Sequence, residues 1–189
     1  HNAYTSEDGI NAGIAEKGYR TELAEGYTGH YKFAEDDKPV KLKGGEDAQV
    51  VSPGYFILKP WFVYDKKDGL YYRYEFGDKQ IDGNNDKQLA VKNILVQYCD
   101  WSYKDENWYL DIDTMSGGDG YFITDGKMEP VTWTKDGEDS PARYFSQDGE
   151  EITLNQGKTW VCIVRNKYKD RFGVYTDEEA MDAARASQE

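Results

Sequence analysis

The sequence has few of the residues from which reactive sites are usually built. Its 189 residues include two histidines, His1 and His30, and two cysteines. A serine or cysteine nucleophile needs a base beside it, most often histidine, and the sequence contains no GxSxG turn that would present a serine. We therefore expect no catalytic residues, and the sequence leans against an enzyme.

The two cysteines, Cys99 and Cys162, lie in the apolar runs ILVQYC and TWVCIV. They have neither the CxxC spacing of a metal site nor the density of a disulfide framework. Two buried, unreactive thiols are the favoured interpretation. A single disulfide between neighbouring strands also fits, because pairing depends on a Cα separation that the sequence does not contain.

Basic residues are outnumbered, with 23 basic against 36 acidic side chains and a net charge of -13. The lysines are scattered among aspartates and form no basic patch, so the chain should repel phosphate backbones and anionic lipid. The apolar runs are far shorter than the roughly 20 residues of a membrane-spanning helix. We predict that the chain itself binds neither nucleic acid nor a membrane surface.

The sequence is rich in β-strand patterns from about residue 48 onward. The run WFVYDKKDGLYYRYEFG predicts a hairpin closed at Asp68-Gly69, where glycine supplies the positive φ of the turn. The nearly continuous apolar run NILVQYCDW predicts a central strand buried on both faces. Further strands are predicted at 107–113, 120–124, 130–134, 142–146, 151–154 and 158–164. The pattern favours a mainly β fold, α+β overall, built as an antiparallel β-sandwich or a partly open barrel.

Helices are predicted at both ends of the sequence. Ser6 is a good N-cap and Gly18 a good C-cap for a short helix between them. Thr176 and Glu179 form a capping box before the alanine-rich C-terminal stretch. The polar, glycine-containing residues 34–47 read as a linker. We therefore divide the chain into three parts: 1–45 as the tail of a first domain plus linker, 46–170 as a β domain, and 171–189 as a helical tail.

The stretch from Val63 to Val164 resembles the C-terminal domain of the YerB-like family of predicted bacterial lipoproteins, a domain of unknown function. The similarity runs in order through YDKKDGLYYRYEFG, IDGNNDKQLAVKNILVQ, SGGDGYFITDGKMEPVTWTK and PARYFSQDGEEITLNQGKTWVCIV. His1 and Asn2 begin a segment that resembles the HNxYTS junction at the end of that family's first domain. Where family members tend to carry histidine, this sequence has Gln80, so a proton-transfer role is not expected at that position.

The resemblance implies an extracytoplasmic protein anchored to the bacterial cell envelope. Most of the family's first domain would lie outside this chain, and contact with the membrane would come only through a lipid anchor upstream of it. The family supplies no established catalytic residues. His1 and Asn2 are candidate residues of the junction between the two domains.

The segment DIDTMSGGDG is compatible with two kinds of site, but neither pattern is complete. Asp111 and Asp113 have the spacing of the first two ligands of a calcium loop, but Met115 takes the next ligand position and no glutamate closes the loop. The glycines after Ser116 do not open a helix, and Asp119 would repel a phosphate. The simpler interpretation is a strand with Trp108, Leu110 and Ile112 facing the core, followed by a turn. We predict no metal and no cofactor.

Aromatic side chains make up 15% of the chain and are the best candidates for recognition. An exposed ring offers a flat apolar face that suits sugar rings and protein partners. The alternation indicates Tyr71, Arg73, Trp101 and Tyr109 as candidate binding residues. Packing of these rings across neighbouring strands is the alternative.

Together these features favour a non-catalytic accessory domain that binds a ligand or a protein in the bacterial cell envelope. An envelope protein or a glycan would be its partner. Two alternatives stay open. The chain could be part of an envelope enzyme whose active site lies mainly in the first domain, or a structural spacer. An aromatic groove would favour the binding domain, a polar pocket at the junction would favour the enzyme, and featureless faces would favour the spacer.

Overall fold

The computed structural model describes residues 5–27 and 29–187. The chain forms two compact units, His1–His30 and Tyr31–Glu189. The first contains helix α1 (Glu7–Lys17), where the Ser6 hydroxyl accepts the N–H of Gly9 at 3.2 Å. Gly18 ends α1 with a φ of 65°, a conformation that costs glycine little. Both predicted caps of this helix are confirmed.

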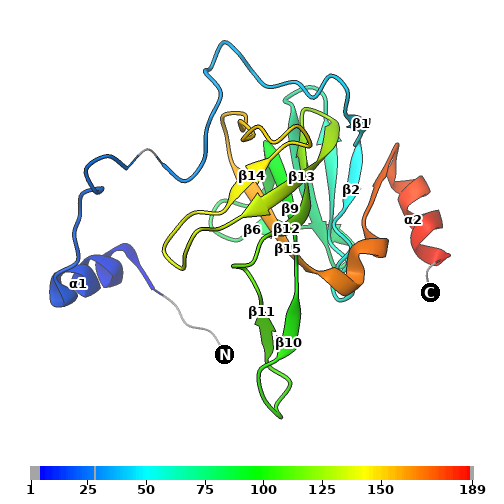
Figure 1. Cartoon of the computed structure of the whole chain (residues 1–189). Coiled ribbons are helices and arrows are strands. Elements are labelled where there is room, and N and C mark those ends of the chain that lie inside the picture. Colours follow the sequence, from blue (N-terminus) through cyan, green and yellow to red (C-terminus); the bar gives the residue numbers. More distant parts are fainter. Residues whose placement is uncertain (1–4, 28, 188–189) are drawn as a thin grey trace. The chain divides into compact units, whose positions relative to one another are not determined.

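The second unit contains two six-stranded sheets (Figure 1). In the first, the strand order is β1 (Glu46–Asp47), β13 (Lys127–Thr134), β12 (Gly118–Thr124), β9 (Asn93–Cys99) and β15 (Thr159–Arg165), with β14 (Arg143–Phe145) on β13. In the second, it is β16 (Gly173–Tyr175), β2 (Val50–Ser52), β3 (Trp61–Asp65), β4 (Leu70–Glu75) and β5 (Asp78–Lys79), with β8 (Ala90–Val91) on β4.

Two short ribbons and two helical segments complete the second unit. They are β6 (Ile81–Asp82) with β7 (Lys87–Gln88), β10 (Trp101–Tyr103) with β11 (Leu110–Ile112), the 3-10 helix η1 (Asn166–Arg171) and helix α2 (Glu178–Ala186). The β10–β11 hairpin extends beyond the ends of the other strands (Figure 1). The prediction of a mainly β, sandwich-like α+β fold is confirmed. The sheets are open, and one pair departs from the antiparallel pattern, because β15 runs parallel to β9.

Strand β9 has all seven of its residues buried. Because side chains alternate along a strand, Ile94 and Val96 pack on one face while Leu95 and Cys99 pack on the other. The first face meets the second sheet through residues such as Phe62. This confirms the prediction, made from its continuous apolar run, that the strand is buried on both sides.

The opposite face of the first sheet is covered by chain from outside the sheets. Leu42 and Leu154 are buried there. The Ala34 N–H donates to the Leu154 carbonyl at 2.8 Å, and the Asn155 side chain accepts from the Val40 N–H at 2.7 Å and donates to the Val40 carbonyl at 3.0 Å. The segment 34–47 is therefore held by hydrogen bonds to residues 154 and 155 and, at its end, by the pairing of β1 with β13.

Helix α2 packs on the second sheet through Met181, which is buried against Val50 and Trp61. Its N-cap is Asp177, whose carboxylate accepts the N–H of Ala180 at 2.8 Å. The predicted cap, Thr176, is therefore one residue too early, because aspartate competes well for the same position.

Cys99 and Cys162 are both free and buried. Cys162 pairs in register with Val96, three residues before Cys99, which places the two cysteines roughly 10 Å apart along the strand direction. They also belong to the cores on opposite faces of the sheet. A disulfide needs Cα atoms within about 7 Å, so the bridge left open by the sequence does not form.

The thiols should be unreactive in the folded protein. Burial raises the pKa of Cys99 and raises the pKa of Cys162 to about 12, so both stay protonated at pH 8, whereas the thiolate is the reactive form. We expect Ellman's reagent to label neither cysteine in the native protein at pH 8 and both after unfolding without reductant. Rapid labelling of the native protein, or no labelling of the unfolded protein, would contradict this assignment.

Candidate ligand-binding site

The structure does not bring the four predicted binding residues together. Tyr71 and Arg73 are buried on β4, Trp101 is half-buried on β10, and Tyr109 is 65% exposed just before β11. The expected exposure of Tyr71 and Arg73 is wrong, because their face of β4 is the one that packs on the first sheet. His1 and Asn2 lie outside the described residues.

The hairpin β10–β11 carries apolar side chains that were expected in the core. Trp108 is 70% exposed and Leu110 is also exposed, whereas Ile112 packs against the core as expected. The reason is topological, since this hairpin pairs only with itself and has no sheet behind most of its length. The turn that follows is built by Asp113, whose carboxylate accepts the backbone N–H groups of Met115 and Ser116. Hydrogen bonding by the Ser116 side chain, together with these two backbone bonds, lowers the pKa of Asp113.

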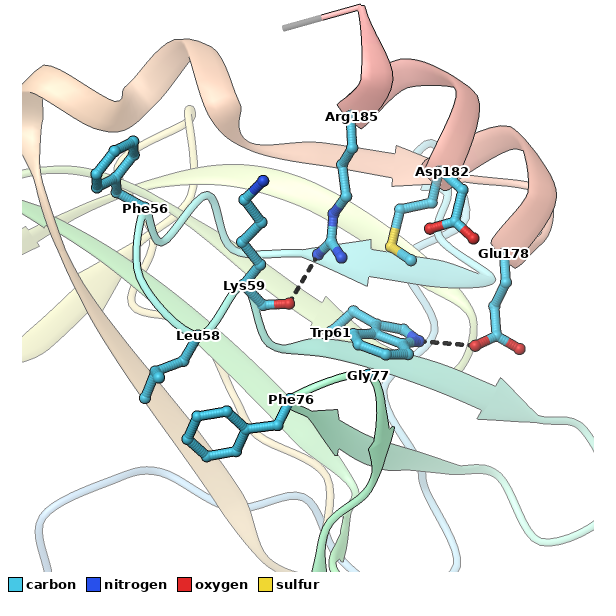
Figure 2. Close-up of a pocket in the computed structure, with 10 residues that line it drawn as sticks. Phe56, Leu58, Lys59, Trp61, Phe76, Gly77, Glu178, Asp182 and Arg185 are labelled. Atoms are coloured by element: carbon cyan, nitrogen blue, oxygen red, sulfur yellow. Dashed lines mark hydrogen bonds between the residues drawn. The ribbon is translucent and has the colours of Figure 1, made fainter. Parts of the chain in front are cut away.

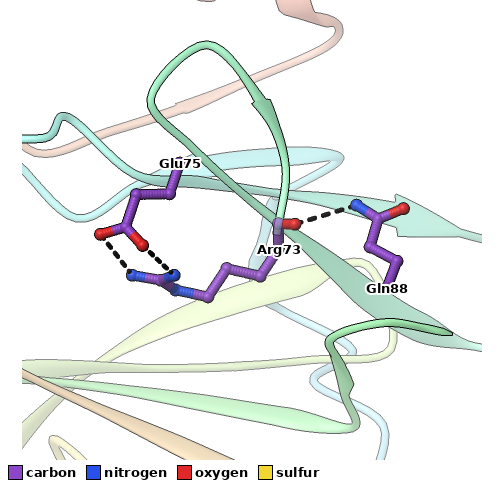
Figure 3. A network of polar contacts seen from close by, with 3 residues as sticks. All are labelled: Arg73, Glu75 and Gln88. Atoms are coloured by element: carbon purple, nitrogen blue, oxygen red, sulfur yellow. Dashed lines mark hydrogen bonds and ion pairs between the residues drawn. The ribbon is translucent and has the colours of Figure 1, made fainter. Parts of the chain in front are cut away.

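Arg73 forms a buried ion pair with Glu75 (Figure 3). Its Nη1 and Nη2 atoms donate to the two Glu75 oxygens at 3.0 and 3.4 Å, and its Cζ lies 4.5 Å from the centre of the Trp160 ring. The Arg73 carbonyl accepts from the Gln88 amide at 2.9 Å. Arg73 is thus an interior residue that links the β4–β5 region to the core between the sheets.

A cleft lies between the β2–β3 loop, the β4–β5 turn and helix α2 (Figure 2). Its volume of about 630 Å³ is within the range of small-ligand sites. We call it the Trp61 cleft, after the residue at its centre. It is lined by Phe56, Leu58, Lys59, Trp61, Phe76, Gly77, Glu178, Met181, Asp182 and Arg185.

The centre of the Trp61 cleft is rigidly held. The Trp61 ring stacks on Tyr74 with 5.0 Å between ring centres, and its Nε1 donates to Glu178 at 2.8 Å. Arg185 donates to the carbonyls of Lys59 and Pro60 at 3.1 and 3.3 Å. Helix α2 is therefore fixed to both the strand and the loop that form the other walls.

The rim of the cleft is apolar and exposed. Phe56 is 50% and Phe76 is 76% exposed, and Leu58 is exposed as well. Leu58, Lys59 and Phe76 have φ values of 66°, 35° and 56°. A left-handed conformation costs a residue with a Cβ about 1 to 2 kcal/mol. The backbone is therefore strained where it holds apolar side chains out of the core, a combination found at functional sites.

The polar groups of the cleft are mainly on α2. The carboxylates of Glu178 and Asp182 lie one turn apart, and Arg185 lies further along the helix. Burial lowers the pKa of Arg185, while nearby Asp182 opposes this shift. Arg185 is already engaged as a donor to the loop. The carboxylates of Glu178 and Asp182 are therefore the polar groups of α2 that are best placed to bond a ligand, and they would do so as acceptors.

The ionisable side chains that line the cleft are Lys59, Glu178, Asp182 and Arg185. Its described lining includes no serine, threonine, cysteine or histidine, and so lacks the usual nucleophile and base pairing. Throughout residues 5–27 and 29–187, no group of three or more metal-ligating side chains could hold a metal ion. No helix in the same ranges is long and apolar enough to cross a membrane.

Sequence reasoning missed the Trp61 cleft, because its walls come from segments more than 100 residues apart. One local signal was available. The apolar run Phe56-Ile57-Leu58 lies between Pro53-Gly54 and Pro60, where turn residues exclude a core strand. An apolar run in an obligatory loop indicates exposed apolar side chains.

Comparison with known families places the chain in one of them. Residues 51–161 match the family model described as the C-terminal domain of a protein of unknown function, DUF3048. The match covers more than half of the 189 residues, and the chain belongs to this family.

A solved structure confirms the YerB-like resemblance. The crystal structure of the YerB protein from Bacillus subtilis is similar, with a TM-score of 0.73 and 26% sequence identity. The alignment covers 93% of this chain and 56% of the YerB chain, so this chain spans just over half of that protein's length. The search of curated proteins returned no match.

The buried Arg73–Glu75 pair should be costly to break. Replacing Glu75 with alanine leaves a buried guanidinium unpaired, and we expect the free energy of unfolding to fall by about 3 to 5 kcal/mol. The double variant Arg73→Met, Glu75→Leu should lose much less. Chemical denaturation measures both, with Glu35→Ala in the exposed Lys38–Glu35 pair as the control, expected below about 1 kcal/mol. An equal loss in Glu75→Ala and Glu35→Ala would contradict the structural role.

Proposed function

We propose that this chain is a non-catalytic binding domain of a bacterial cell-envelope lipoprotein, with its ligand bound in the Trp61 cleft. The observation that carries the proposal is the rim, where Phe56, Leu58 and Phe76 are exposed around a ligand-sized cavity and the backbone is strained at Leu58 and Phe76. Exposing such side chains has no benefit for folding. It presents to a ligand an apolar surface that is already in position, and this reduces the entropy lost on binding.

The lining indicates the kind of ligand. The apolar rim suits the flat C–H face of a sugar ring or an apolar peptide side chain. The carboxylates of Glu178 and Asp182 suit the hydroxyl or N–H donors of the same molecule. A glycan or a peptide of the cell envelope has this combination. The envelope location rests on membership of the YerB-like family.

The experiment is a search for ligands followed by measurements on variants. The labelled chain is applied to a glycan array and to an immobilised peptide library, and each hit is titrated by calorimetry. We expect Phe76→Ala to raise the Kd of the true ligand roughly tenfold, the size of a typical aromatic contact at a binding hot spot. Asp182→Asn should also weaken binding, since it removes one of the two acceptor charges.

The matched control is Tyr109→Ala, which removes another exposed ring that lies outside the cleft. It should leave the Kd unchanged. A ligand whose Kd is unchanged by Phe76→Ala but raised by Tyr109→Ala would place the site on the β10–β11 hairpin. Absence of binding in both screens, with the protein folded, would contradict a binding domain.

A further inference from the structure

A second surface, separate in chemistry from the Trp61 cleft, lies along η1. The segment from Arg165 to Arg171 has four basic residues and one acidic residue, in a chain whose net charge is -13. The interpretation of the basic residues as scattered overlooked this segment. Lys169 is paired with Asp119 at 2.9 Å. In the described part of the chain, Arg165, Lys167 and Arg171 have no carboxylate partner within ion-pair distance.

These three cations lie over aromatic rings. Arg165 and Lys167 are 4.6 and 4.2 Å from the centre of the Trp101 ring. Both also approach the Tyr168 ring, at 4.8 and 4.9 Å. Arg171 lies 4.8 Å from the centre of the Phe56 ring and 5.8 Å from that of the Tyr168 ring. Arg165 also donates from Nη2 to the Tyr168 hydroxyl at 2.9 Å. Ring faces orient cations without neutralising them, so the remaining N–H groups stay available to an anion. We call Trp101, Arg165, Lys167, Tyr168 and Arg171 the basic ring surface.

We propose that the basic ring surface binds an acidic segment of another protein. Charge complementarity selects an anionic partner, since these cations are surplus in a chain with abundant carboxylates. Tryptophan, tyrosine and arginine are also the residues most enriched at the energetic centres of protein interfaces. The surface is composed of them, apart from Lys167.

The neighbouring residues favour a peptide over a plain polyanion. Tyr103 contacts Trp101 with 5.2 Å between ring centres, and exposed Trp108 contacts Tyr103 at 4.7 Å. These rings extend the surface with apolar area that phosphate or sulfate groups would not use. Asp170, exposed on η1, would repel a dense row of negative charges. A segment with acidic and apolar side chains interspersed fits both features.

The test uses synthetic polymers as probes. A random copolymer of glutamate and tyrosine, poly-glutamate and inorganic polyphosphate are immobilised, and binding is measured by biolayer interferometry at low and physiological salt. We expect the copolymer to bind most tightly. Lys167→Glu with Arg171→Glu should raise its Kd roughly tenfold, because two attractions become repulsions.

The control variant, Lys66→Glu with Lys67→Glu, changes the net charge by the same amount on an exposed turn away from η1. It should change the Kd less than twofold. Three results would overturn the proposal. They are equal weakening by the two double variants, tighter binding to polyphosphate than to the copolymer, and no binding to either peptide polymer. Self-association of the wild type that Lys167→Glu with Arg171→Glu abolishes would assign the surface to a second copy and also overturn it. None of the residues of the basic ring surface lines the Trp61 cleft, although Tyr168 and Arg171 contact the ring of Phe56 at its rim. The proposed function is tested separately, by Phe76→Ala and Asp182→Asn, so the two proposals can fail independently.

Discussion

The rest of the structure depends on the burial of β9 on both faces. A strand buried on one side needs apolar residues at every second position, but β9 needs them at almost every position, and its sequence NILVQYC provides them. Its two amide side chains are hydrogen-bonded. Asn93 donates to the Asn155 carbonyl at 2.8 Å, and Gln97 accepts from the Tyr144 hydroxyl at 2.8 Å. The strand therefore belongs to both cores without leaving these amide groups unpaired.

The two candidate surfaces lie at the margins of this arrangement. The Trp61 cleft is formed by a loop, a turn and α2 on the second sheet, and the basic ring surface by η1 and the self-paired hairpin β10–β11. Such elements can carry exposed rings and strained backbone because the buried centre supplies most of the stability. This is the usual arrangement in proteins, in which a rigid scaffold positions the loops that carry function.

The sequence predicted best the features that depend on local physics. Ser6 and Gly18 cap α1 because capping involves groups within one turn, and Gly69 closes its hairpin with a φ of 71°. The family resemblance was likewise visible in ordered motifs. The parallel pairing of β15 with β9 was not predictable locally, since it joins residues about 66 positions apart.

The candidate sites were predicted less well, for two physical reasons. Alternation groups Tyr71 with Arg73 on one face of β4, but it does not say which face is covered when both carry aromatic residues. The Trp61 cleft depends on the docking of α2, and Met181 is the one large apolar residue in that helix that indicates it. The basic ring surface differs from the cleft, because its cations lie close together in the sequence, between Arg165 and Arg171. What the sequence did not show is that they lie on rings and not on carboxylates.

Hydrogen exchange tests the central role of β9 most directly. If the strand is the shared wall of both cores, the amide hydrogens of residues 93–99 should be among the slowest in the chain and exchange only on global unfolding. Those of the β10–β11 hairpin and of residues 54–59 should exchange much faster, through local opening. Exchange of the β9 amides at the rate of the hairpin amides would contradict the account.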